Sequence, residues 1–162
     1  MTKYQEIISN LKQIDTAKAE YLEEEIDIII HKLKFLTADN LPKTVVLDQE
    51  DNFSPLSSSV LAEKIKIAGG RYSSNLEEGA DCIIILQSNE SLYGQLAEVL
   101  DSVVIKSSGA YQNNNIYIIQ ESDFNSGDDT FLKDTEILAE ILQPKYFVYG
   151  HDGTAWVKFE VQ

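Results

Sequence analysis

Four short runs of mainly apolar, β-branched residues constrain the fold of this chain more than any other feature. The runs are 44–47 (TVVL), 81–86 (DCIIIL), 103–105 (VVI) and 116–119 (IYII). None of them alternates polar with apolar residues, and such continuous hydrophobicity is typical of parallel strands that are covered on both faces. Segments with the apolar spacing of helices lie between and after these runs. Strands that alternate with helices predict an α/β domain of three layers, a mostly parallel sheet flanked by helices.

The helical segments of this region end at residues that helices do not tolerate. We expect three helices, at 57–68, 90–100 and 130–142. Gly69 and Gly70 end the first of them, because glycine adopts the left-handed conformation of a helix C-cap without strain. Pro144 follows the last, because proline lacks the N–H that a helix needs. The polar residues 112–115 (QNNN) indicate a turn between the third and fourth strands.

The N-terminal part of the chain carries helical spacing only. Apolar residues recur every three or four positions over 2–14, as on one face of an amphipathic helix. Asp15 or Thr16 can cap a second helix, which extends to about Leu36 and exposes a cluster of acidic side chains. We therefore divide the chain into an N-terminal helical arm over 1–40 and an α/β lobe over 41–162.

The C-terminal segment 154–161 (TAWVKFEV) differs from the four apolar runs because its polar and apolar residues alternate. Such alternation predicts an antiparallel strand at the edge of the sheet, with one face exposed. Residues 151–153 (HDG) offer a turn before it. Through this turn we expect a hairpin with residues 146–149 (YFVY).

Charge and composition exclude several classes of partner. The 162 residues include 27 acidic and 13 basic side chains, for a formal net charge of −14. Binding to nucleic acid or to anionic lipid needs a dense basic patch, so we expect neither partner. The single Cys82 excludes an intramolecular disulfide and a cysteine-based zinc site. With only two histidines as well, we expect no metal and no other cofactor.

The sequence has no recognisable export signal or membrane span. Its N-terminal stretch lacks the basic and apolar regions of a signal peptide. Its apolar runs are far shorter than the roughly 20 residues that cross a bilayer. As written, the sequence predicts a cytoplasmic protein without membrane insertion. A periplasmic or surface location follows only if Met1 is not the natural start.

Four stretches of the lobe occur in a characteristic order. They are 44–48 (TVVLD), 60–71 (VLAEKIKIAGGR), 75–86 (NLEEGADCIIIL) and 110–147, which holds a polar turn, the run IYII, a loop and a last helix before a proline. Their order and spacing resemble the C-terminal lobe of class III periplasmic substrate-binding proteins, the ABC-transporter receptors for ferric siderophores, haem and cobalamin. The resemblance implies a single lobe of a type III periplasmic-binding-like fold that is not an enzyme. The family has two lobes that close on a ligand, and this sequence accounts for one.

Polar and aromatic residues follow three of the expected strands. In open α/β sheets ligands meet the carboxyl ends of strands, and the resemblance implies the family's ligand-contacting loops at the same positions. Phe53 and Phe124 offer an apolar floor, with Gln87 and Asn89 as hydrogen-bonding groups. The candidate ligand-binding residues are Asp48, Gln49, Phe53, Gln87, Ser88, Asn89, Asp123, Phe124 and Asn125. The alternative is that these loops are ordinary solvated segments.

Two properties of the family have poor counterparts in this sequence. The family often carries an arginine in the loop before its last helix, whereas this loop reads NSGDD (125–129). An anionic siderophore or a haem propionate would meet Asp123, Asp128 and Asp129 there. Family members also dock on a permease through one exposed glutamate in each lobe. Glu63 could serve here, although Lys66 lies near the expected position.

Other chemistry finds less support in the sequence. The pattern Asp123-x-Asn125-x-Gly127 resembles the start of a calcium loop, and Asp134 lies at the final offset of such a loop. The pair His151-Asp152 has no identifiable nucleophile beside it, and no glycine-rich phosphate loop follows a strand. We therefore expect that the protein is not an enzyme.

Three functions remain open from the sequence. The leading hypothesis is a single-lobe relative of the substrate-binding proteins that binds a small ligand weakly or serves as an interaction module. The second is a solute-binding component for iron–siderophore, haem or cobalamin uptake, completed by a second lobe. The third is an acidic scaffold that binds proteins through the helices of 2–36, which also offer a surface for a homodimer.

Overall fold

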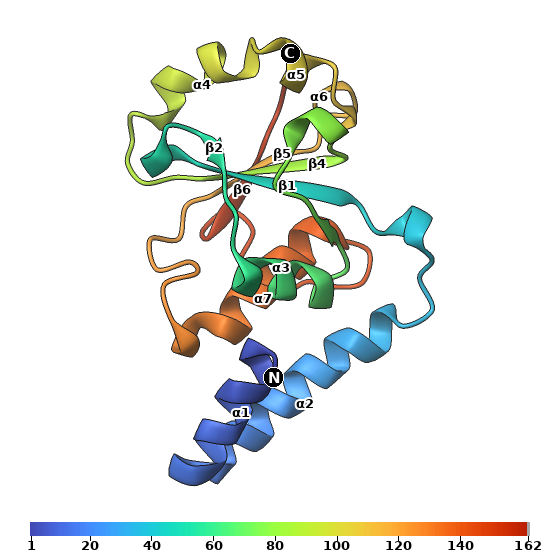
Figure 1. Ribbon diagram of the computed structural model, residues 1–162, viewed down its shortest axis with the longest axis vertical. Coiled ribbons are helices and arrows are strands. Elements are labelled where there is room, and N and C mark those ends of the chain that lie inside the picture. Colours follow the sequence, from blue (N-terminus) through green and yellow to red (C-terminus); the bar gives the residue numbers. More distant parts are fainter. Residues whose placement is uncertain (162) are drawn as a thin grey trace.

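The computed structural model describes residues 1–161, and in it helices cover both faces of a single sheet (Figure 1). The helices are α1 (Lys3–Ile14), α2 (Thr16–Leu33), α3 (Ser59–Ile67), α4 (Leu92–Leu100), α5 (Val103–Lys106), α6 (Gly109–Gln112) and α7 (Phe131–Leu142). Short 3₁₀ turns are η1 (Ala38–Asn40), η2 (Gln49–Asp51), η3 (Leu76–Glu78) and η4 (Asp128–Thr130). The strands are β1 (Lys43–Asp48), β2 (Ser54–Pro55), β3 (Arg71–Tyr72), β4 (Cys82–Leu86), β5 (Ile116–Ile119) and β6 (Trp156–Phe159).

The sheet is mostly parallel, as the sequence predicts. Its strand order is β2-β1-β4-β5-β6, and β3 pairs with β1 beside β2. The central strands β1, β4 and β5 run parallel, with Val46 opposite Ile84 and Ile84 opposite Tyr117. β6 is antiparallel to β5 and β2 is antiparallel to β1. The expected three-layer α/β class and the antiparallel strand at the C-terminal edge are therefore confirmed.

The central strands are apolar on both faces because each face supports a separate core. In β1, Val46 packs toward α1, α2, α3 and α7, whereas Val45 and Leu47 pack toward α4, α5 and α6. Ile84 and Ile83 divide in the same way in β4. Figure 1 shows α3 and α7 on one side of the sheet and α4, α5 and α6 on the other. This double burial explains the lack of polar alternation in the sequence.

The prediction of a third strand at 103–105 is wrong, because these residues belong to the helix α5. The position beside β4 that an interior strand would take is occupied, because β4 already pairs with β1 and β5, and β5 pairs with β6. Only Ile105 of this segment enters the core, and the side chain of Val103 is 81% exposed. Tertiary packing here outweighs the preference of valine for strands.

The expected hairpin between 146–149 and the terminal strand is also wrong, because 146–149 is not a strand. The carboxylate of Glu140 on α7 accepts hydrogen bonds from the backbone N–H groups of Tyr149, Gly150 and His151 at 2.7, 3.1 and 3.2 Å. These donors serve α7 and cannot also serve a strand pair. β6 instead pairs with β5.

The two helices expected in the N-terminal part are present as α1 and α2, which pack against each other as a hairpin. Thr2 and Gln5 form a capping box at the start of α1, and Asp15 caps α2 by accepting from the N–H of Lys18 at 3.2 Å. α2 ends at Leu33, three residues before the expected end. The buried face of this hairpin belongs to the same apolar core as α7. Within residues 1–161, no helix has the length and apolarity to cross a membrane.

Candidate ligand-binding site

A pocket of about 370 Å³ lies at the carboxyl ends of β1, β4 and β5. This is the edge at which open α/β sheets bind ligands, and the volume falls within the range of about 300–1,000 Å³ of small-molecule sites. Its lining residues come from the strand ends and from the loops that follow them: Asp48, Glu50, Leu56, Leu86, Gln87, Ser88, Ile119, Glu121, Ser122, Phe124 and Asn125.

Five of the nine residues expected from the sequence line this pocket together. They are Asp48, Gln87, Ser88, Phe124 and Asn125. They come from the ends of three parallel strands that are far apart in the chain, so only the sheet register brings them to one edge. Their meeting supports the expected position of the site, and their contact with a ligand remains a prediction.

Gln49 does not face the pocket but holds its rim. The side chain is buried, and its Oε1 accepts from the backbone N–H groups of Ser88 and Asn89 at 2.7 and 3.1 Å. Its Nε2 donates to Oδ1 of Asn89 at 3.1 Å and to Oε1 of Gln95 at 3.0 Å. Gln49 therefore fixes the loop that carries Ser88, and it draws the side chain of Asn89 away from the pocket.

Phe53 and Asp123 also lie outside the pocket lining. Phe53 follows the turn after η2 with a left-handed φ of 61°, and its ring packs on the core formed with α4, α5 and α6. The apolar floor therefore has Phe124 without Phe53. Asp123 is exposed to solvent.

Six lining residues are not among the nine candidates named from the sequence: Glu50, Leu56, Leu86, Ile119, Glu121 and Ser122. Leu86 and Ile119 are the last residues of β4 and β5, so the strand-end rule could have included them. Leu56 carries no such signal. It reaches the pocket because β2 folds back on β1, where the N–H of Leu56 donates to the carbonyl of Val46 at 2.7 Å.

The polar groups of the pocket are mainly hydrogen-bond acceptors. Asp48, Glu50 and Glu121 contribute carboxylates, and no lysine or arginine lines the pocket. Lys133 forms an ion pair with Glu121, with Nζ and Oε2 3.1 Å apart. Among the buried side-chain polar atoms of residues 1–161, Oε1 of Gln87 alone has no hydrogen-bond partner. The pocket therefore favours a ligand that donates hydrogen bonds or carries positive charge.

An ion pair buried beside the pocket answers the calcium-loop alternative. Nζ of Lys64 lies 2.8 Å from Oδ2 of Asp134 and 2.9 Å from Oδ1 of Asn125. Two of the oxygens that a calcium ion would need therefore bind an ammonium group, whose charge repels a second cation. Residues 123–134 therefore do not have the geometry of a calcium-binding loop, because Asn125 and Asp134 bind Lys64.

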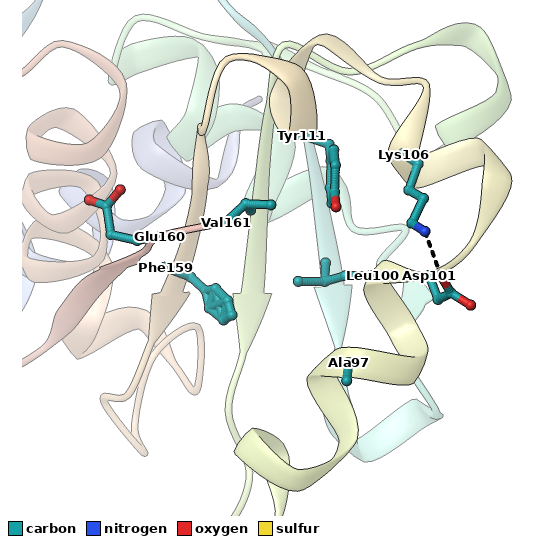
Figure 2. A pocket seen from close by; sticks show the side chains of 8 residues that line it. All are labelled: Ala97, Leu100, Asp101, Lys106, Tyr111, Phe159, Glu160 and Val161. Atoms are coloured by element: carbon teal, nitrogen blue, oxygen red, sulfur yellow. Dashed lines mark hydrogen bonds and ion pairs between the residues drawn. The ribbon is translucent and has the colours of Figure 1, made fainter.

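A second hollow, of about 450 Å³, lies on the opposite side of the sheet between α4, α5, α6 and the end of β6 (Figure 2). Lys106 and Asp101 form an ion pair at its rim, with Nζ and Oδ1 2.6 Å apart. This hydrogen bond lowers the pKa of the Asp101 carboxyl and raises that of the Lys106 ammonium. Glu160 accepts a hydrogen bond from Asn114. None of the nine residues expected from the sequence lines this hollow, so the edge pocket is the stronger candidate.

Glu63, the residue considered for docking on a permease, has a structural role here. Its Oε1 accepts from the N–H of Tyr4 at 2.8 Å, and its Oε2 accepts from the N–H of Lys3 at 3.1 Å. A carboxylate at the N-terminus of a helix accepts hydrogen bonds from free N–H groups and is attracted to the positive end of the helix dipole. Glu63 thus attaches α1 to α3 and does not stand free for a partner.

Comparison with solved structures gives the fold a context. S. aureus IsdE complexed with haem matches with a TM-score of 0.63 and 18% identity, over 86% of this chain and 63% of that protein. A substrate-binding protein of an ABC transporter from Listeria monocytogenes matches with a TM-score of 0.64 and 16% identity, over 87% and 63%. Helicobacter pylori CeuE in a Ni–His complex matches with a TM-score of 0.61 and 15% identity, over 88% and 52%.

The chain has the fold of ABC-transporter substrate-binding proteins. The resemblance inferred from its segment order is confirmed at this level. The match spans between 52% and 63% of the length of these three proteins. No protein-family model matches the sequence, and no curated protein does.

Proposed function

We propose that this protein is a non-enzymatic, single-lobe relative of the substrate-binding proteins and that it binds a small ligand weakly in the edge pocket. The observation that carries the proposal is the convergence of strand-end residues on a pocket of about 370 Å³, lined by the carboxylates of Asp48, Glu50 and Glu121 and by no lysine or arginine.

The charge of the pocket indicates which ligand class it accepts. Asp48 and Glu50 repel carboxylates, so haem propionates and anionic siderophores are disfavoured. A ferric hydroxamate complex with zero or positive net charge fits better, because it combines N–H donors with apolar linkers that can contact Leu86 and Phe124. A similar fold occurs in a protein of an Fe³⁺-hydroxamate transport system from Saccharomonospora viridis, with a TM-score of 0.59 and 13% identity.

The expected affinity is low because the pocket has one wall. High-affinity sites bury most of the ligand surface, whereas this pocket contacts the ligand from one side. We expect a dissociation constant on the order of 0.1 mM, which corresponds to about 5.5 kcal/mol. A complete solute receptor, in which a second lobe supplies the opposite wall, is the alternative form of the same proposal.

NMR titration of the ¹⁵N-labelled protein tests this function, because it detects weak binding and locates it. The probes are a gallium(III) trihydroxamate of net charge +1, which is the diamagnetic equivalent of the ferric complex, cobalamin and haem. We expect the trihydroxamate to shift the amide signals of Ser88 and Asn125. Asp48→Asn should weaken its binding about tenfold, a change of about 1.4 kcal/mol. Asp39→Asn, on the exposed turn η1, is the matched control.

Two results would contradict the proposal. One is that none of the three probes shifts the signals of the pocket residues. The other is that Asp48→Asn and Asp39→Asn have the same effect, which would mean that only net charge matters.

A second candidate function is self-association through the arm. A hollow of about 540 Å³ lies between α1, α2 and the start of α7, and its mainly apolar lining includes Ile14 and Tyr21, which are 83% and 56% exposed. Its lining also includes charges of both signs, Lys18 and Asp129, and opposite charges on one self-complementary patch can pair across a two-fold axis. Light scattering should then give twice the chain mass of 18.2 kDa, and Tyr21→Ser should restore the monomer.

A further inference from the structure

Lys64 and Asp134 are the two most deeply buried charged residues in the described part of the chain, and they lie next to the pocket. Lys64 is on α3 with a side chain that is 1% exposed, and its partner Asp134 on α7 is also 1% exposed. The ammonium group lies 5.4 Å from the ring centre of Phe131. Placing two charges in an apolar core is costly, and an apolar pair of similar volume often serves stability as well or better. The pair therefore calls for an explanation other than stability.

Both partners of this pair hold the loop between β5 and α7. Oδ2 of Asp134 accepts from the N–H of Asn125 and from the hydroxyl of Thr130, both at 2.9 Å. Lys64 donates to Oδ1 of Asn125 at 2.9 Å. The loop is thus attached at its middle, through Asn125, and at its end, through Thr130. Asn125 takes a left-handed φ of 59° within it, a conformation that asparagine tolerates better than most residues.

This arrangement also sets the orientation of the Asn125 amide. An ammonium group only donates, so the side chain must turn its oxygen toward Lys64. The NH₂ group then remains for other partners, and within residues 1–161 it is neither hydrogen-bonded nor among the buried unpartnered atoms. Asn125 lines the pocket. It therefore brings a hydrogen-bond donor to a pocket of acceptors.

We propose that Lys64 and Asp134 are positioning residues of the edge pocket, which hold the 123–130 loop so that Phe124 and the NH₂ group of Asn125 face the ligand. This inference rests on the proposed function and adds to it a ligand feature. The ligand needs an acceptor, such as a hydroxamate oxygen, for Asn125, and a donor for Asp48.

The test removes both charges together, because either single substitution leaves a buried charge without a partner. In Lys64→Met/Asp134→Leu, we expect a melting temperature close to that of the original protein. We expect the Asn125 amide to exchange its hydrogen at least tenfold faster, because it loses its acceptor. The affinity for the gallium trihydroxamate should fall at least tenfold. If the pair served stability alone, the double substitution would lower the melting temperature and leave the affinity for the gallium trihydroxamate unchanged.

The matched control is Lys106→Met/Asp101→Leu, which removes an exposed pair of the same charges on the other side of the sheet. It should change neither exchange in the loop nor affinity. Original exchange at Asn125 in the Lys64/Asp134 variant would overturn the proposal, and so would original affinity. If the unsubstituted protein binds none of the probes, the proposed function fails, while faster exchange at Asn125 still identifies Lys64 and Asp134 as the residues that hold the loop.

Discussion

Replacing Glu140 with glutamine should destabilise this protein more than the loss of one charge suggests. The carboxylate on α7 is buried and accepts four hydrogen bonds, two on each oxygen. Oε2 receives the N–H groups of Tyr149 and Gly150, at 2.7 and 3.1 Å. Oε1 receives the N–H of His151 at 3.2 Å and Nε1 of Trp156 at 3.1 Å.

An amide in this position must lose two of these bonds in either orientation, because its NH₂ group cannot accept. Facing the NH₂ toward Tyr149 and Gly150 costs less, since Gly150 is exposed and water can replace part of what is lost. A hydrogen bond to a charged group contributes about 1.5–3 kcal/mol. For two of them, with this partial replacement, we expect a loss of about 3 kcal/mol.

Urea unfolding followed by fluorescence measures this loss directly, because Trp156 is the only tryptophan of the chain and donates to Glu140. The midpoint should fall without a change in slope. Glu98→Gln, an exposed position on α4, is the matched control and should change stability by less than about 0.5 kcal/mol. A loss below about 1 kcal/mol for Glu140→Gln would refute the role assigned to the carboxylate.

Three further predictions concern the backbone, the tyrosines and a helix cap. Gly69→Ala should cost about 2–4 kcal/mol in urea unfolding, because φ is +96° and the new Cβ would lie 2.7 Å from Cγ of Gln143; a neutral result would contradict this packing. Burial raises the pKa of three tyrosines to about 12: Tyr4, Tyr117 and Tyr149. The folded state holds these protons more tightly than the unfolded state, whose pKa is near 10. Their contribution to stability is therefore complete below pH 10 and lost as the pH rises toward 12, and absorbance at 295 nm and melting temperature should change together over that range. Ordinary titration of all tyrosines near pH 10 without unfolding would show that these rings are accessible. Asp15→Ala should cost about 1 kcal/mol and lower the helical circular dichroism signal near the melting transition, and no change would mean that α2 does not depend on this cap.

The fold class could be predicted from the sequence because its decisive signal is local. A strand covered on both faces needs apolar residues at consecutive positions, and TVVL, CIII and IYII meet this condition. Helix ends were predictable for the same reason, since Asp15 and Gly69 act on neighbouring backbone groups. Local signals failed at 103–105 and 146–149, where strand-like residues form a helix and a non-strand segment. Pairing depends on what the rest of the sheet already occupies.

The position of the candidate site could be predicted from the sequence, but its full set of lining residues could not. The strand-end rule located five lining residues. It could not predict Leu56, which lines the pocket only because β2 folds back on β1. It also wrongly included Phe53, whose ring packs on the core beside α4, α5 and α6.

Sequence alone thus determined the alternation of strands and helices, the strongly acidic balance and the edge of the sheet at which polar side chains gather. Tertiary structure alone decided the rest. Lys64 meets Asp134 across 70 positions, and Glu63 meets Tyr4 across 59. The physical reason is that the residues next to a charged side chain in the sequence do not reveal whether it is buried. Only the packing of α3 against its neighbours removes Lys64 from water and brings Lys64 and Glu63 to their partners.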